Sequence, residues 1–520
     1  MVEYLIEYVL ILILFVFCFV LRFIPHIISP LGIGVDHWFW KAYISKYKQD
    51  RQFPPVLPQY ILDVHQWYPP LFPLVIAYIP KSFFESHSHL IAVFIDLIRL
   101  TLLLKLTYLL TNGQMLAVYT AGIIYATIPL LISYNIQLNP RGLAALFLDI
   151  LIALLLWHYF GNGSMWLWPI VILIAAIILL THKMTTQLFF FLCICSGIIS
   201  LDWRLFLLIP TSILVAILMS RGFYTKVAIA HWDVLAFWNR NWQWRGAHPI
   251  KESPIYGQES YESTTRQHKK GIRGVLKHVC FLFAYNPAGW MIFLIKIITG
   301  IRRLSGGTFT SFHNIIINMD LTMFYWIFLL LFFMLLWATL TVLVPFMRCL
   351  GMGYLYLYNA AFPAALLWGI AFYVSVKDKI IWIEYMSCVF ISLLCIVVFY
   401  KHLKNSKTKK IDSDFDNALN YLKQKTRGVV MCLPMQWLDV VAYKTRQPVL
   451  YGGHGYGFKI LEPVFPRLLI PMSHIIDRYG VRYLLTINGY LPDNFLKELE
   501  GMHVREFGEY QIYHIKCDLD

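Results

Sequence analysis

Long runs of apolar residues recur along the whole sequence and constrain its fold more than any other feature. The runs lie at roughly 4–24, 88–110, 115–135, 142–160, 203–220, 276–300, 321–346, 352–374 and 379–400. A helix of about 20 apolar residues crosses the hydrocarbon core of a bilayer and satisfies its own backbone hydrogen bonds there. The sequence therefore predicts an α-helical polytopic membrane protein.

One further apolar run, residues 166–201, is interrupted by Thr181, His182 and Lys183. A His-Lys pair at mid-bilayer depth is costly, so this run is expected to form two short helices that meet at the break. The expected total is then about 11 spans. The break is either an ordinary turn whose charges reach water, or a place where His182 and Lys183 meet an anionic lipid group.

The composition supports membrane insertion and narrows the functional classes. Hydrophobic residues make up 58% of the chain and charged residues only 14%, whereas soluble domains carry about 25% charged residues. The net charge of +15 indicates contact with anionic membrane lipids or binding of a substrate phosphate, and nucleic acid is not an expected partner. The 9 Cys have no CxxC spacing, which predicts neither a disulfide framework nor a metal site.

The loop after the first apolar run combines carboxylates with prolines and aromatic residues. Asp36 is followed by two Trp residues, which are typical of the headgroup level. The prolines between 54 and 73 indicate a fixed, non-helical loop. Either Asp36 or Asp63 could act as a general base in this loop, although Asp36 could instead only cap a helix that begins near His37. The candidate substrate contacts here are His37, His65 and Tyr68.

A second candidate site lies where the run 142–160 begins. Asn139 is a good N-cap, Pro140 suits the first helical turn, and Arg141 follows where free N–H groups point outward. A helix N-terminus beside an arginine is suited to bind phosphate. The alternative is that Arg141 extends to the lipid headgroups, as long basic side chains do at helix ends.

Residues 221–275 form the longest loop between the expected spans. Trp238 and Trp242 lie one helical turn apart, so the segment is expected to lie in the interface plane with its aromatic face in lipid. Arg240 and Arg245 are candidate contacts for an anionic substrate. The segment is either a surface anchor or a lid that becomes ordered when a lipid-linked substrate enters.

The composition changes after residue 400, where a Lys-rich linker begins. Beyond it, apolar strand patterns alternate with helical patterns, which predicts a small soluble α/β domain. The expected strands are 429–432, 448–451, 482–487 and 510–515. The expected domains are therefore a membrane domain, 1–402, and a soluble domain, 412–520. The glycine-rich segment 452–457 lacks the spacing of a nucleotide-binding motif and is interpreted as a loop.

These features together resemble the GT-C superfamily, the polytopic glycosyltransferases that use polyprenyl-phosphate sugars. The resemblance rests on Asp36, on the Pro- and Tyr-rich segment 68–73, on the helix start at 139–141 and on the break at 181–183. It implies a GT-C-like fold in which an acidic residue of the first extracytoplasmic loop, here Asp36, acts as base. Many members carry paired acids there. This chain has Asp36 followed by His37, so a divalent cation is left open and no metal ligands are assigned.

The resemblance implies transfer of a sugar from a polyprenyl-phosphate donor to a glycan, lipid or other cell-envelope acceptor. It also implies a plasma-membrane protein with an extracytoplasmic active face, although the basic residues of 41–51 and 240–245 favour the opposite orientation under the positive-inside rule. Two other classes stay open: a transporter or flippase of a lipid-linked glycan, since broken spans are also a transporter feature, and a non-catalytic membrane subunit. The shaped first loop and the C-terminal domain favour the enzyme.

Overall fold

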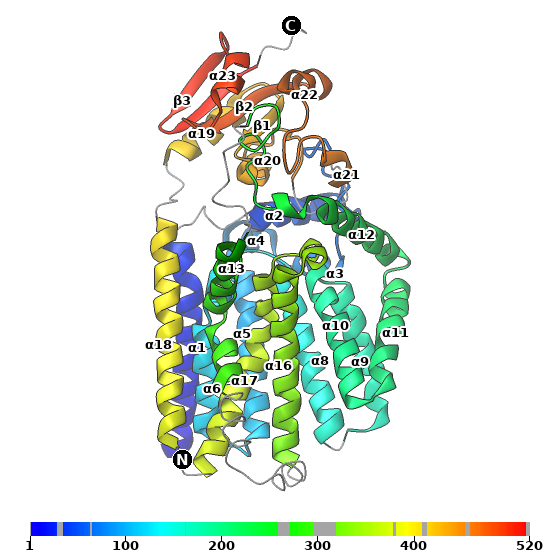
Figure 1. Ribbon diagram of the computed structural model, residues 1–520, viewed down its shortest axis with the longest axis vertical. Coiled ribbons are helices and arrows are strands. Elements are labelled where there is room, and N and C mark those ends of the chain that lie inside the picture. Colours follow the sequence, from blue (N-terminus) through cyan, green and yellow to red (C-terminus); the bar gives the residue numbers. More distant parts are fainter. Residues whose placement is uncertain are drawn as a thin grey trace.

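The structure, a computed structural model, describes residues 2–28, 35–62, 65–161, 163–257, 271–295, 319–377, 381–407, 413–452 and 458–515. It has two layers, a bundle of long helices and a smaller layer above it that contains a sheet (Figure 1). The layers follow the sequence, because the apolar runs form the bundle and the C-terminal residues form the sheet.

The bundle contains α1 (Val2–Ile28), α5 (His89–Leu110), α6 (Met115–Thr127), α7 (Pro129–Tyr134), α8 (Arg141–Phe160), α9 (Trp168–Leu179), α10 (Lys183–Ser200), α11 (Trp203–Met219), α13 (Gly271–Tyr285), α16 (Met319–Leu343), α17 (Gly353–Lys377) and α18 (Ile381–Lys407). Among the described residues, 5 helices are long and apolar enough to cross a membrane, and a bent pair makes up to 6. Shorter apolar helices, α6, α9 and α11 among them, accompany these. The prediction of a polytopic helical membrane protein is confirmed, while the total of about 11 spans stays a prediction.

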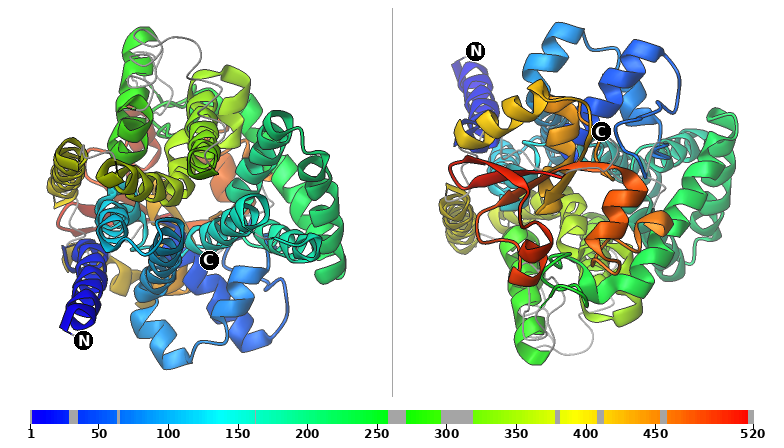
Figure 2. Two further views of the ribbon diagram at one scale, coloured as in Figure 1. Left: turned by 90° about the horizontal axis from the view of Figure 1, so that it is seen from below. Right: turned by 90° about the horizontal axis from the view of Figure 1, so that it is seen from above.

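Helix α17 forms the buried part of the bundle and α1 its rim. The apolar window of α17 is 89% buried, whereas that of α1 is 28% buried, and α1 lies at the edge in both views of Figure 2. The exposed apolar side chains of α1 are therefore suited to contact lipid. Gly369 of α17 lies against α6, where an added Cβ would come within 2.9 Å of the Ala117 carbonyl oxygen. The missing side chain lets these two helices approach closely.

Prolines divide two of the apolar runs that hydropathy alone treats as single spans. The run 115–135 is divided at Ile128, because Pro129 begins α7. In the run 276–300, α13 ends at Tyr285 and a second helix begins at Pro287. The axes of the two helices differ in direction by 97°. Neither run is one continuous helix, because a proline cannot continue the hydrogen-bond ladder of the preceding turn.

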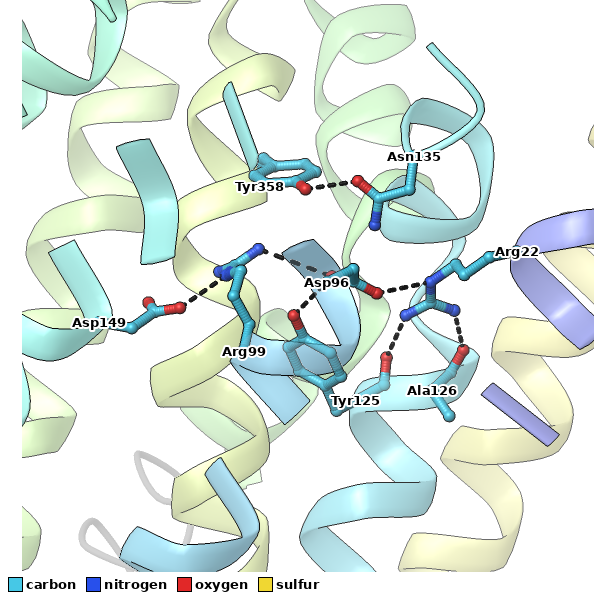
Figure 3. A network of polar contacts seen from close by, with 8 residues as sticks. All are labelled: Arg22, Asp96, Arg99, Tyr125, Ala126, Asn135, Asp149 and Tyr358. Carbon is cyan, nitrogen blue, oxygen red and sulfur yellow. Dashed lines mark hydrogen bonds and ion pairs between the residues drawn. The ribbon is translucent and has the colours of Figure 1, made fainter. Parts of the chain in front are cut away.

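Four charged side chains are fully buried in the bundle and pair with one another (Figure 3). Arg22 Nε donates a 2.9 Å hydrogen bond to Asp96, and Arg99 Nε donates one of 2.6 Å to Asp149. The Tyr125 hydroxyl donates to the other oxygen of Asp96 at 2.7 Å. Two cations thus balance two carboxylates, which avoids the large cost of an uncompensated buried charge.

This ionic network lies beneath the start of α8. The Tyr358 hydroxyl donates to Asn135, and the Arg99 guanidinium lies 5.0 Å from the centroid of the Tyr358 ring (Figure 3). A Cβ added to Gly142 would come within 3.3 Å of the same hydroxyl. The network therefore supports the helical turn that presents Arg141.

The upper layer begins with α2 (Val35–Asp50), which is followed by the non-helical residues 51–62 and 65–70 and then by α3 (Leu71–Ile76) and α4 (Lys81–His87). The expected non-helical loop is present in 51–62 and 65–70, but Pro73 lies inside α3, and the helix before the loop begins at Val35. The interfacial segment forms α12 (Phe223–Asn241). The prediction that its aromatic face lies in lipid was wrong for Trp238, because this ring packs against Phe465 at 5.7 Å between centroids and lines a cavity.

The C-terminal sheet has the strand order β1-β2-β4-β3. Its strands are β1 (Val429–Leu433), β2 (Val481–Ile487), β3 (His503–Phe507) and β4 (Tyr510–His514), and the helices used below are α19 (Ser413–Gln424), α20 (Leu438–Thr445) and α23 (Asp493–Glu498). β1 and β2 are parallel, and the other pairs are antiparallel. Three expected strands are present, but 448–451 forms only isolated bridges through Val449. β3 was not expected, because its side chains are mostly exposed.

The first loop and the C-terminal residues share one apolar core. Trp38 and Phe39 of α2 and Tyr60 of the loop lie in the same buried cluster as Val430 and Leu484 of the sheet. The upper layer is therefore assembled from both ends of the chain. Separate folding of 1–402 and 412–520 stays a prediction, and any such separation would expose part of this shared core.

Candidate functional site

A cavity of about 490 Å³ lies where the upper layer meets the bundle. Its described lining comes from the first turns of α2, the starts of α8 and α10, the C-terminal half of α12 and the turn η3 (Pro345–Leu350) before α17. Six of the sequence-predicted site residues line it: Asp36, Tyr68, Arg141, His182, Lys183 and Arg245. We call it the membrane-surface cavity.

Arg141 is the lining residue best suited to hold an anion. It begins α8, and its backbone N–H donates a 3.0 Å hydrogen bond to Asn139 Oδ1. The side chain is 6% exposed, and its guanidinium lies 5.0 Å from the centroid of the Tyr134 ring. Within the described residues, Arg141 Nε and Nη1 have no hydrogen-bond acceptor. Two unused donors on a buried guanidinium suit a phosphate or carboxylate, whose oxygens accept charge-assisted hydrogen bonds.

The break in the run 166–201 supplies a second helix start. α9 ends at Leu179 and α10 begins at Lys183, which confirms the predicted break. His182 caps α10, because its Nδ1 accepts a 3.3 Å hydrogen bond from the Thr185 N–H. Two long helices, α8 and α10, thus begin at the cavity, where their free N–H groups and dipoles favour an anion.

The Pro-rich loop contacts the same break. The Leu71 N–H donates a 2.9 Å hydrogen bond to the Leu180 carbonyl. This contact brings Tyr68 to α10, and Lys183 Nζ lies 4.9 Å from the Tyr68 ring centroid. Burial, and after it the charge of Asp36, raises the pKa of Tyr68, so its phenol stays protonated at neutral pH.

Arg245 borders the cavity on the side of α12. Its guanidinium lies 4.5 Å from the centroid of the Trp238 ring. It donates to the carbonyls of Arg348 and Cys349 at 3.0 and 3.4 Å, which fixes the η3 turn. Burial lowers the pKa of Arg245 to about 10, so the side chain is still cationic at neutral pH.

Asp36 is the one carboxylate in the described lining of the cavity. It lies in the first turn of α2 and is partly buried. Arg141, Lys183 and Arg245 supply three positive charges against it, so the lining has an excess of positive charge. An anionic ligand is therefore attracted to this cavity, with a carboxylate beside it.

A divalent cation, left open by the sequence, finds few ligands among the described residues. No group of three or more His, Cys, Asp or Glu is placed there to hold a metal ion. Mg²⁺ and Ca²⁺ require six or more oxygen ligands, of which carboxylates are the usual protein contribution. Asp36 is the one carboxylate in the described lining, so a Mg²⁺ ion there would take most of its ligands from water and a substrate phosphate.

His37 lies outside the cavity lining. It is 2% exposed, and its Nδ1 accepts a 3.2 Å hydrogen bond from the Leu138 N–H. This bond joins α2 to the segment just before α8. Burial, and after it the charge of Lys41, lowers the pKa of His37 to about 3, so the ring is neutral at moderate pH.

Three other predicted residues are also not in the described lining. His65 is exposed and stacks on Trp67, with 6.1 Å between ring centroids. Arg240 forms a 2.9 Å ion pair with Glu462 of the C-terminal layer. Asp63 lies outside the described residues. Arg240 thus joins α12 to the C-terminal layer, while the role of Asp63 stays a prediction.

Several lining residues were missed by the sequence analysis, including Tyr134, Gln187, His231 and Tyr354. Gln187 lies one helical turn after Lys183, so helical periodicity could have indicated it. Its Nε2 lies 2.6 Å from His231 Nε2. Burial, and after it the charge of Lys183, lowers the pKa of His231 to about 3. No local pattern places His231 or Tyr354 here, because α12 and α17 reach the cavity only through tertiary packing.

Comparison with solved structures identifies the fold. ArnT from Cupriavidus metallidurans bound to undecaprenyl phosphate matches with a TM-score of 0.56 and 11% sequence identity, over 97% of each chain. The same protein in the apo state matches with a TM-score of 0.58 and 11% identity, again over 97% of each chain. The oligosaccharyltransferase AglB from Archaeoglobus fulgidus, with an inhibitory peptide and a dolichol-phosphate, matches with a TM-score of 0.53 and 10% identity, over 99% of this chain and 75% of its own.

No protein-family model matches the sequence, and no curated protein sequence matches it. The structural matches nevertheless extend over almost the whole chain, from the bundle to the C-terminal layer. They show that the chain has the GT-C membrane fold, as the resemblance in the sequence implied.

Proposed function

We propose that this protein is a membrane glycosyltransferase that moves a sugar from a polyprenyl-phosphate-linked donor to a glycan, lipid or other cell-envelope acceptor. The observation that carries the proposal is the buried Arg141 guanidinium, whose Nε and Nη1 lack acceptors among the described residues, at a cavity that also holds Asp36. The fold adds support, because ArnT was solved with undecaprenyl phosphate and AglB with a dolichol-phosphate.

In the proposed reaction, an acceptor oxygen attacks the anomeric carbon of the donor sugar. A new C–O bond forms while the C–O bond to the lipid phosphate breaks, and the phosphate leaves with the electron pair. Asp36 takes the proton of the acceptor hydroxyl, and Asp63 is the second candidate for this role. Arg141 and Lys183 hold the phosphate charge, so the leaving group needs no proton.

The membrane fold meets a physical requirement of such a donor. The polyprenyl tail of the donor stays in the bilayer. The donor sugar and the acceptor must therefore meet at the membrane surface. The two helix starts that border the membrane-surface cavity suit the phosphate at that level. Location in the plasma membrane with this cavity on the extracytoplasmic side is part of the proposal.

The test is to incubate the purified full chain, in nanodiscs, with a panel of labelled polyprenyl-phosphate sugars and candidate acceptors. Label transfer coupled to release of polyprenyl phosphate supports the proposal. The second candidate, a flippase of a lipid-linked glycan, is favoured by the 97° break near Tyr285. Movement of the intact donor between leaflets of proteoliposomes, without label transfer from any donor, would support the flippase instead.

A further inference from the structure

A second cavity, of about 770 Å³, lies in the upper layer between α2, α4 and the C-terminal helices α19 and α20. It shares no described lining residue with the membrane-surface cavity. Seven of its lining residues are Lys or Arg, and Glu85 is the one carboxylate among the described lining residues. We call it the basic cavity.

Most of the positive charge in the basic cavity is not balanced by carboxylates. Three of the seven cations have partners: Lys46 with Asp50 at 2.9 Å, Lys81 with Glu85 at 3.8 Å and Lys444 with Asp416 at 2.9 Å. Lys48, Lys423, Arg427 and Arg446 have no carboxylate partner among the described residues. Four like charges around one concave space repel one another. A bound polyanion would attract all four and offset this repulsion.

The backbone conformation of Arg446 also favours an anion site in the basic cavity. Arg446 is the C-cap directly after α20 and has the left-handed conformation, with φ of 60°. Glycine is the usual residue at such a position, because a Cβ disfavours that conformation. The chain instead places an arginine there, and its side chain lines the basic cavity.

We propose that the basic cavity binds a ligand that carries several phosphate charges. Its volume suits a polyphosphorylated group, and seven cations from both ends of the chain surround it. The ligand is either the headgroup of an anionic lipid or the phosphate groups of a soluble molecule, since both present the same chemistry to Lys and Arg. This binding goes beyond sugar transfer and does not require it.

Helix α2 links the two cavities. Asp36 and Trp40, in its first turns, line the membrane-surface cavity, while Ser45 and Lys48 line the basic cavity. A helix rises 1.5 Å per residue, so Asp36 and Ser45 are about 14 Å apart along its axis. A ligand in the basic cavity therefore contacts the helix that carries Asp36.

The experiment uses the full chain in detergent and two probes, tripolyphosphate and dihexanoyl-phosphatidylinositol 4,5-bisphosphate, each titrated by calorimetry. Dihexanoyl-phosphatidylcholine, which is zwitterionic and has no net charge, is the lipid control. The test variant is Arg427→Gln with Arg446→Gly, which removes two unpaired charges. The matched control is Lys497→Gln, an exposed lysine of α23 in the same layer. Arg446→Gly alone serves if the double variant does not fold, because glycine relieves the left-handed backbone.

We expect the wild type to bind at least one anionic probe and the double variant to bind it at least about tenfold more weakly. Tripolyphosphate binding alone identifies a soluble ligand, and binding of the anionic lipid alone identifies a headgroup. Lys497→Gln should bind as the wild type does, and Arg141→Ala should keep the binding that the double variant loses. No binding of either probe by the wild type, equal affinity in the Arg427 and Arg446 variants, or loss of binding in Arg141→Ala would overturn the proposal. The last result would place the anion in the membrane-surface cavity.

Discussion

The phenol of Tyr60, in the Pro-rich first loop, donates a 2.7 Å hydrogen bond to the carboxylate of Asp439, in the first turn of α20. Both side chains are buried, and 379 residues of sequence separate them. The bond joins the loop that carries the candidate site to the C-terminal layer. The loop is therefore held from above by the C-terminal layer and from below by its contact with the α9–α10 break.

Tyr60→Phe should destabilise the folded protein by about 1.5–3 kcal/mol, because it removes a buried hydrogen bond to a carboxylate. The measurement is the shift in thermal unfolding of the purified chain, with Tyr78→Phe as control at a side chain that is 89% exposed. Equal unfolding temperatures for the two variants would show that the bond does not contribute.

Arg141→Ala and Lys183→Ala should each weaken binding of a polyprenyl phosphate by about 1.5–3 kcal/mol, because each removes a charge-assisted bond to the phosphate. Binding is measured in nanodiscs by fluorescence or calorimetry, and thermal unfolding is followed alongside. Arg240→Ala is the matched control, because this arginine pairs with Glu462 away from the cavity. Wild-type affinity in both test variants would contradict the assignment of the phosphate site.

The helical bundle was largely predictable from the apolar runs. A backbone segment in lipid must satisfy its own N–H and C=O groups, and a helix does so within one segment. The apolar runs correspond to the helices of the bundle, and the break at Lys183 was anticipated from the cost of its charge in the membrane. The interruptions at Pro129 and Pro287 were not, because mean hydropathy does not register the lost N–H of proline. The buried ion pairs of Asp96 and Arg99 were also not predicted. Isolated charges barely lower the mean hydropathy of a long apolar run such as 88–110.

The candidate site was predictable only where local chemistry indicates function. Arg141 at a helix start and Asp36 beside Trp residues could be selected from their neighbours in sequence. His231 and Tyr354 could not, because their place in the cavity depends on how α12 and α17 pack. Arg240 was chosen for its charge, and its ion pair with Glu462 depends on a contact across 222 residues of sequence.

The stability of the protein should fall as the pH drops from about 6.5 toward 3, through His37. Its folded pKa is about 3, below the value near 6.5 of an unfolded histidine. The unfolded chain therefore binds more protons in this window, and the contribution present above pH 6.5 is lost at roughly 1 kcal/mol per pH unit.

His37→Asn should reduce this pH dependence, since Asn keeps an acceptor for the Leu138 N–H but does not titrate. Thermal unfolding between pH 7 and 5 measures the effect, with the exposed His65→Asn as control. The same loss of stability on acidification in wild type and His37→Asn would exclude His37 as its cause.

Arg99→Ala should destabilise the bundle by about 3–5 kcal/mol, because it leaves the buried Asp149 carboxylate without its cation. Lys105→Ala removes an exposed cation from the same helix and should cost well under 1 kcal/mol. Unfolding in a graded denaturant series compares the two. A double variant, Arg99→Met with Asp149→Leu, should recover most of the loss, because it removes both charges together. Similar costs for the two single variants would contradict the role of the network.

Asp36→Asn should lower the rate of sugar transfer by about 10²–10⁴-fold, because asparagine cannot take the proton of the acceptor hydroxyl. The alternative is that Asp36 only stabilises the start of α2, in whose first turn it lies. Asp36 lies inside the first turn and not at the N-cap, where its charge stabilises the helix dipole by about 0.3–1 kcal/mol, so a purely structural role predicts nearly wild-type turnover and a stability change of about 1 kcal/mol or less. The same substitution at Asp50, at the other end of α2 and paired there with Lys46, is the matched control.

Turnover of the purified Asp36→Asn and Asp50→Asn proteins, each with a measured unfolding temperature, separates the two roles of Asp36. A folded Asp36→Asn protein that keeps more than about a tenth of wild-type turnover lies outside the range expected for a lost general base. The role would then pass to Asp63, the other carboxylate proposed in this loop, and Asp63→Asn would be expected to show the loss. If Asp36→Asn and Asp63→Asn both stayed active, neither of these two carboxylates would be the general base.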